Sequence, residues 1–128
     1  MTAHIVRLGT PRSPGEGTRI GTVRRPPRGV KKADHAAQNR YDVWFPNLAP
    51  SAVTVNIALH AATEAEWKAF TRAYRAEMAS PDTGRTLDLL AVLSHQTSFS
   101  VGCYCADESR CHRSVLRDLL REHGAKLE

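Results

Sequence analysis

The sequence predicts an α/β fold: a small single domain with a three-layer-like sheet of about four strands, mostly parallel, flanked by helices. Two observations predict it. Short strand-like segments alternate along the chain with segments of helical periodicity. The length of 128 residues is the size of one domain, with 41% apolar and 24% charged residues, as is ordinary for a globular protein. We therefore treat residues 1–128 as one domain.

The first half of the chain contains short strands separated by loops. Residues 11–18 are rich in proline, glycine and serine, which predicts a loop. The strand that precedes Pro26 and Pro27 ends before them, because proline has no backbone N–H to donate to a sheet. A short helix is expected over Lys31–Asn39. The expected strands are His4–Leu8, Arg19–Val23 and Tyr41–Phe45.

The clearest helix lies in the second half. Thr63 and Glu66 have the spacing of a capping box, and the helix ends at Ser80-Pro81. A second helix is expected over Thr86–Leu93, whereas Pro50–Leu59 fits a brief helix or a strand equally well. The residues that recur at helical spacing along the first helix, and so face the core, are Trp67, Phe70, Tyr74 and Met78.

A strand, a turn and a helix are expected over residues 99–123. The strand is Phe99–Cys105, and Cys111 or His112 opens a helix that runs to about His123. In open α/β sheets, ligands bind outside the carboxyl ends of the strands, where turns lead into helices. This rule points to residues 105–113 as the site.

An anion site is the preferred interpretation of this turn. Cys111 lies at a helix N-terminus, where backbone N–H groups and the helix dipole favour a thiolate or a bound anion. Arg113 offers a guanidinium for the same anion. Cys105 or Cys111 is then the nucleophile and His112 the proton carrier.

Two other interpretations stay open. Cys103, Cys105, Cys111 and His112 are four ligands of the type that zinc prefers, within ten residues. Their spacing is unusual for a zinc finger, and neighbouring ligands on one helical turn are expected to diverge, so zinc ranks below the anion site. In the third interpretation the thiols are structural, and for Cys103 we prefer this one, as a small core hydrophobe on the strand face of Val101.

Positive charge is concentrated at the N-terminal end. The net charge is +5, and residues 1–32 contain eight Lys or Arg against the single acid Glu16. The basic loops at 9–32 would attract phosphates. Arg24 and Arg28 lie close to prolines, which restrict the backbone, so these arginines lose less conformational entropy when they bind an anion. Both are therefore candidate anion-binding residues. Non-specific nucleic-acid contact is the alternative use of this charge, although 6% aromatic residues is low for a stacking platform.

Three cysteines form a poor disulfide framework, which predicts reduced thiols and a cytoplasmic location. No apolar run approaches the ~20 residues that cross a bilayer. We expect no membrane association and no cofactor, and the oligomeric state is not defined by the sequence.

Several segments match those of one protein family: Arg24–Val30, Asp42–Trp44, Leu48–Ser51, Trp67 with Phe70, Tyr74 and Glu77, and Asp107–Leu116. Together they resemble the Domain of Unknown Function 488 (DUF488) family, the YeaO-like proteins. The resemblance spans nearly the whole chain, but Val23 and Pro26 stand where relatives have an aspartate and a tryptophan. Many relatives also lack the thiols. If the family shares one site, the resemblance implies that His112 and Arg28 are better candidates than any cysteine.

The leading hypothesis is therefore an anion-binding or phosphate-binding, enzyme-like domain that acts on a nucleotide or a phosphorylated small molecule. Its expected residues are Arg24, Arg28, His112 and Arg113. The alternative is a non-catalytic, nucleic-acid-associated basic module. A zinc-binding or thiol redox domain is the third hypothesis.

Overall fold

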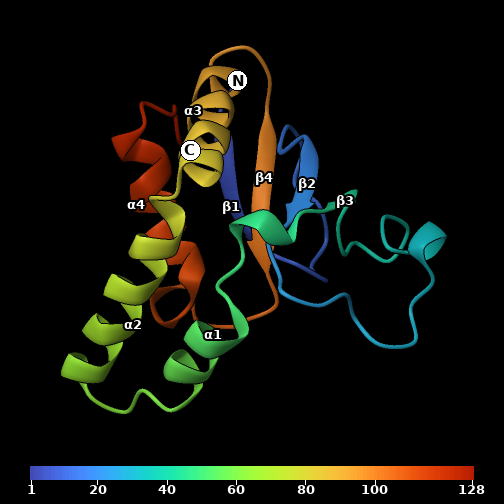
Figure 1. Cartoon of the computed structure of the whole chain (residues 1–128). Helices are drawn as coiled ribbons and strands as arrows, with labels where there is room; N and C mark the ends of the chain where they lie inside the picture. The colour runs from blue at the N-terminus through green and yellow to red at the C-terminus, as the bar shows by residue number, and fades with distance from the viewer.

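Four parallel strands form the sheet in a computed structural model that describes residues 1–128 (Figure 1). The order across the sheet is β1-β4-β2-β3, and all neighbouring pairs are parallel. The predicted α/β class, with about four strands and flanking helices, is confirmed. The strands are β1 (Ala3–Arg7), β2 (Thr18–Gly21), β3 (Val43–Trp44) and β4 (Phe99–Cys103).

The last strand in the sequence, β4, lies in the middle of the sheet, and all five of its residues are buried. Gly102 faces Gly21 across the β2–β4 pair. A Cβ added at Gly102 would come within 2.6 Å of Leu8 Cδ2, so this position accepts no larger residue without movement. Because the pairing is parallel, the carboxyl ends of β2 and β4 lie side by side. Thr22 is thereby brought beside the end of β4.

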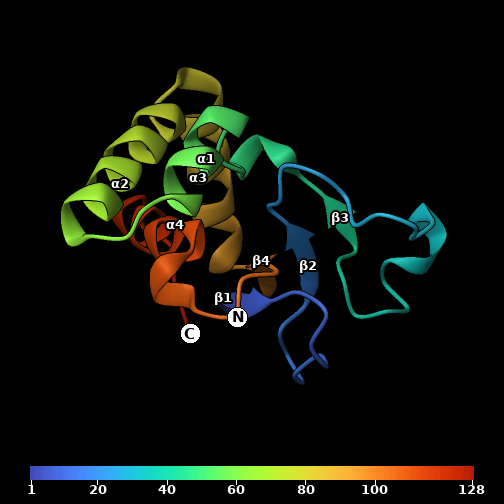
Figure 2. The ribbon, with the colours of Figure 1, turned by 90° about the horizontal axis from the view of Figure 1, so that it is seen from below.

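Four helices pack on the face of the sheet that carries Phe99 and Val101, and Figure 2 shows them together on one side of the strands. Their apolar faces and these strand residues form the main core. The segment Pro50–Leu59, whose sequence fits a helix or a strand equally well, contains a helix. The Ser51 side chain caps this helix by accepting a hydrogen bond from Thr54 N. The helices are α1 (Ala52–Leu59), α2 (Glu64–Met78), α3 (Pro81–Ser94) and α4 (His112–Glu122).

The opposite face of the sheet is covered by loops. Arg19 is 1% exposed on this face and pairs with Glu16 in the loop after β1. Tyr41 lies against Gly21, where even a Cβ would meet the tyrosine ring. A parallel sheet needs cover on both faces, and here loops supply the third layer.

Several expected boundaries differ from the structure, and those of β1, β2 and β3 differ from the expected strands by one or two residues at each end. Only Lys32–Asp34 forms a 3-10 turn within the expected helix Lys31–Asn39, and none of these three residues is buried. The helix α3 begins at Pro81 instead of Thr86, since Ser80 caps it and proline suits the first helical position. The strand β4 ends at Cys103, two residues earlier than predicted. None of the helices is long and apolar enough to cross a membrane.

Candidate functional site

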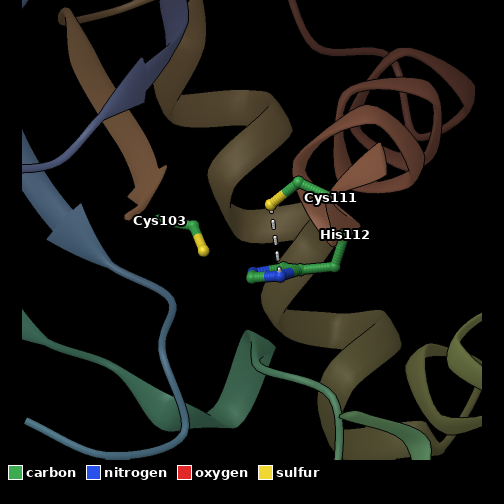
Figure 3. A group of neighbouring side chains, drawn as sticks. All are labelled: Cys103, Cys111 and His112. Atoms are coloured by element: carbon green, nitrogen blue, oxygen red, sulfur yellow. Dashed lines mark hydrogen bonds between the residues drawn. The ribbon is translucent and has the colours of Figure 1, made fainter. Parts of the chain in front are cut away.

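The side chains of Cys103, Cys111 and His112 meet at the carboxyl edge of the sheet (Figure 3). Cys103 is the last residue of β4, and Cys111 and His112 form the start of α4. All three are buried, at 7%, 3% and 7% exposure. One potential ligand atom from each lies within 4.8 Å of the others.

The expected divergence of Cys111 and His112 is wrong. The Cys111 sulfur lies 3.8 Å from His112 Nδ1. Cys111 is the N-cap of α4 with an extended backbone (φ −132°, ψ 152°), so its side chain does not follow the helical rotation from residue to residue. The two neighbours can therefore converge on one point.

Cys105 joins the group from the surface. Its sulfur lies 3.6 Å from the Cys103 sulfur, although the residue itself is exposed. None of the three cysteines is in a disulfide. The structure thus brings together Cys103, Cys105, Cys111 and His112, which we call the thiol–imidazole cluster.

Thr22 fixes the orientation of the His112 ring. Its hydroxyl donates to the Gly102 carbonyl at 2.9 Å and lies 3.1 Å from His112 Nε2. A hydroxyl has one proton, so with that proton on Gly102, the Thr22 oxygen accepts from Nε2–H. In neutral His112, Nδ1 then carries the lone pair and faces the Cys111 sulfur. The ring also packs edge-on against Tyr74, with centroids 5.6 Å apart.

The three thiols have different acidities. Donation from the Cys103 and Cys105 thiols lowers the pKa of Cys111, and nearby His112 adds to this effect against the cost of burial. The pKa of Cys103 is raised by its hydrogen bonds to the other two thiols and by burial. Although the bond with Cys103 lowers it, the pKa of Cys105 is raised overall by the Cys111 sulfur and burial. Cys111 is therefore the most acidic of the three thiols, and the pKa of exposed Cys105 lies above that of an ordinary cysteine.

Arg113 is a buried cation without an acidic partner. It is 3% exposed, and its Nη2 donates to the Cys105 carbonyl at 2.5 Å, while its buried Nε makes no hydrogen bond. No carboxylate pairs with it, whereas Arg19, the other buried arginine, pairs with Glu16. Buried charges are normally paired. The guanidinium therefore lacks an anion next to the cluster.

The other two arginines expected at the site do not bond to the cluster. Arg24 Nε donates to the Pro50 carbonyl at 2.9 Å, and Nη2 to the Ala49 carbonyl at 3.0 Å. Arg24 thereby holds the turn that precedes α1. Arg28 is exposed and makes no hydrogen bond or ion pair.

Sequence reasoning did not identify Thr22 or the role of Glu77. The Glu77 carboxylate accepts from Ser51 N at 2.9 Å, from the Ser51 hydroxyl at 2.6 Å and from the Thr54 hydroxyl at 2.7 Å. It ties α1 to α2 beside the site. The usable signal for Thr22 was its position near the carboxyl end of the expected strand Arg19–Val23, where the carboxyl edge of the sheet is built.

Comparison with known proteins identifies the family. No curated protein and no solved structure matches the chain. The model of DUF488-N3a, described as the active DUF488-N3 subclade, matches residues 3–124, which include the whole cluster and Arg113. The resemblance expected from the sequence is thus confirmed, and the chain belongs to the DUF488-N3 family, in its active subclade.

Proposed function

We propose that the protein is an enzyme that acts on an anionic small molecule, a nucleotide or another phosphate-bearing compound, at the carboxyl edge of its sheet. The observation that carries the proposal is Arg113. A guanidinium that is 3% exposed and has no carboxylate partner is costly to bury, and a substrate anion would offset that cost.

The start of α4 supports the same location for the anion. Cys111 gives this helix no side-chain cap, so its first backbone N–H groups are not capped. Uncapped N–H groups and the helix dipole bind phosphates and carboxylates. Arg113 lies in the first turn of this helix and places its charge at the same end.

The thiol–imidazole cluster supplies reactive groups next to this anion position. Cys111 has a lowered pKa, His112 contacts its sulfur through Nδ1, and Cys105 reaches the surface. No single thiol combines a lowered pKa with exposure. The cluster is therefore the proposed reactive centre as a unit, and the family description as an active subclade favours a catalytic role.

Titration calorimetry with the full chain tests the proposal. Inorganic phosphate and a nucleoside monophosphate are expected to bind, whereas the uncharged nucleoside binds more weakly. Arg113→Gln should weaken phosphate binding about tenfold to a hundredfold, the value of a charge-assisted hydrogen bond. Arg28→Gln is the matched control, because Arg28 is exposed and unpaired. Absence of phosphate binding, or an equal loss in both variants, would overturn the proposal.

A nucleic-acid-binding module is the second candidate, favoured by exposed, unpaired charge in one loop. That charge comes from Arg25, Arg28, Lys31 and Lys32. Binding of this kind grows with polymer length and falls steeply with salt. Affinity for a long single strand that depends on Arg28 and not on Arg113 would favour this candidate over the enzyme.

A further inference from the structure

The thiol–imidazole cluster has the shape and the chemistry of a metal site. We propose that Cys103, Cys105, Cys111 and His112 bind one zinc ion, with Nδ1 as the histidine ligand. The inference shares its location with the proposed function but does not depend on it, since metal binding is measured without a substrate.

The distances between ligand atoms fit a tetrahedral ion. Zinc–sulfur bonds of about 2.3 Å in a tetrahedron place neighbouring ligand atoms about 3.8 Å apart. The Cys103 and Cys105 sulfurs are 3.6 Å apart, and the Cys111 sulfur is 3.8 Å from His112 Nδ1. The ligand atoms of Cys103, Cys111 and His112 all lie within 4.8 Å of one another, so these three need only a small contraction, and Cys105 joins them through its contact with Cys103.

The histidine is already oriented as a ligand. Because the Thr22 hydroxyl accepts from Nε2–H, the lone pair of His112 lies on Nδ1, the nitrogen that faces the sulfur of Cys111. Metal-bound histidines usually donate their other ring N–H to a neighbouring acceptor, which fixes the tautomer. Thr22 occupies this place, and its own proton is held by the Gly102 carbonyl.

The donor set selects the metal. Three sulfurs and one imidazole are soft ligands that suit zinc, whereas magnesium and calcium require oxygen. All three cysteines are free thiols, so none is used in a disulfide. Zinc would hold the three sulfurs as thiolates, which gives the cluster one shared role in place of three separate thiols.

Cys105 distinguishes this site from a fully enclosed one. Cys103, Cys111 and His112 are buried, but Cys105 is exposed on the turn after β4. Structural zinc sites are closed, and catalytic ones keep a position that a solvent molecule or substrate can take. With Cys105 as the fourth ligand the tetrahedron is complete, so a substrate anion would bind beside the zinc and not on it, held by Arg113, which donates to the Cys105 carbonyl.

The direct test is metal analysis of the full chain purified under reducing conditions without chelators. One zinc per chain is expected. Titration of metal-free protein with cobalt should give the absorption of a tetrahedral ion with thiolate charge-transfer bands. Failure of the wild-type chain to retain zinc and to bind cobalt would overturn the inference, and this measurement needs no variant to fold.

Variants then assign the ligands. Cys111→Ser and His112→Ala should each lower zinc affinity at least tenfold, while His60→Ala, at an exposed histidine in the turn after α1, should not. Cys105→Ser changes a surface residue and should fold. It should weaken the thiolate charge-transfer band of the cobalt form, and an unchanged spectrum would overturn Cys105 as a ligand.

The two proposals fail separately. Arg113→Gln should lose phosphate binding and keep its zinc. Zinc without phosphate binding in the wild-type chain would leave the metal site standing and remove the proposed function. Phosphate binding that depends on Arg113 in a chain that binds no metal would do the reverse.

Discussion

Thr22 and His112, ninety positions apart in the chain, are joined at 3.1 Å between Oγ1 and Nε2. Parallel pairing of β2 with β4 produces this contact, because it sets the residue after β2 beside the start of α4. Thr22 is fully buried and bonds to both Gly102 and His112. It is therefore a positioning residue for the cluster.

Thr22→Val keeps the shape of the side chain and removes its hydroxyl. His112 Nε2–H then loses its partner, while the Gly102 carbonyl keeps only the Thr22 backbone N–H at 3.0 Å, which should reduce the unfolding free energy by about 1–3 kcal/mol in urea denaturation. Zinc affinity, measured by chelator competition, should fall about tenfold to a hundredfold, since the ring is no longer held. Thr86→Val removes a hydroxyl that bonds only within α3, to the Asp82 carbonyl, and should change neither value appreciably. An unchanged zinc affinity in Thr22→Val would exclude the positioning role.

Acid should weaken the contact between α1 and α2. Burial raises the pKa of Glu77, but hydrogen bonds from Ser51 and Thr54 and the nearby charge of Arg24 bring it below its ordinary value of 4.5 overall. The folded protein thus binds this proton less well than the unfolded chain. The stabilisation is complete above the unfolded pKa and is lost as pH falls through the folded pKa.

Glu77→Gln should cost about 1–3 kcal/mol at neutral pH, because an amide N–H₂ then faces hydroxyl and backbone donors. Urea denaturation between about pH 3 and pH 6 should show a smaller pH dependence in the variant than in the wild-type chain. Parallel pH profiles in the two proteins would mean that another carboxyl group causes the acid sensitivity.

Brief alkylation of the metal-free, folded chain should modify Cys105 before the other thiols. Cys105 is exposed, whereas Cys103 and Cys111 are 7% and 3% exposed. Peptide mass spectrometry after a short treatment with iodoacetamide measures the order, and zinc should slow the reaction. Faster labelling of Cys111, whose pKa is lowered, would show instead that reagents reach its thiolate directly.

Alanine substitutions at two glycines of one loop distinguish the energetic cost of backbone strain from the cost of steric overlap. Gly15 and Gly17 both have positive φ, at 82° and 72°, so alanine is strained at either position. A Cβ at Gly15 meets nothing within 4 Å, but a Cβ at Gly17 would overlap the Ser98 carbonyl oxygen. Gly15→Ala should cost about 1–2 kcal/mol of unfolding free energy, and Gly17→Ala clearly more. Equal costs, compared by thermal and urea denaturation, would mean that the 95–98 turn moves away freely.

Local sequence signals predicted the elements well. The capping box of Thr63 and Glu66 forms as expected, and strand alternation correctly placed Cys103 in the interior beside Val101. The turn after β4 was predicted to be the site region because strand ends and helix starts are visible in the sequence. These features depend on neighbours within a few residues.

The tertiary contacts of the site could not be predicted from the sequence. Nothing local places Thr22 against His112, since that contact depends on the order of strands in the sheet. The convergence of Cys111 and His112 depends on the cap conformation of one residue. Arg24 was expected to bind an anion, and the carbonyls that occupy its Nε and Nη2 belong to a turn more than twenty positions away.

The buried guanidinium of Arg19 has a dynamic consequence for the loop face of the sheet. Besides Glu16, it donates to the carbonyls of Thr10, Pro11 and Asn39. Two loops distant in sequence thus share one anchor, and neither can detach without breaking bonds to the same side chain. In native-state hydrogen exchange, amides around residues 9–17 and 39–42 should open as one cooperative unit, independently of the helical layer.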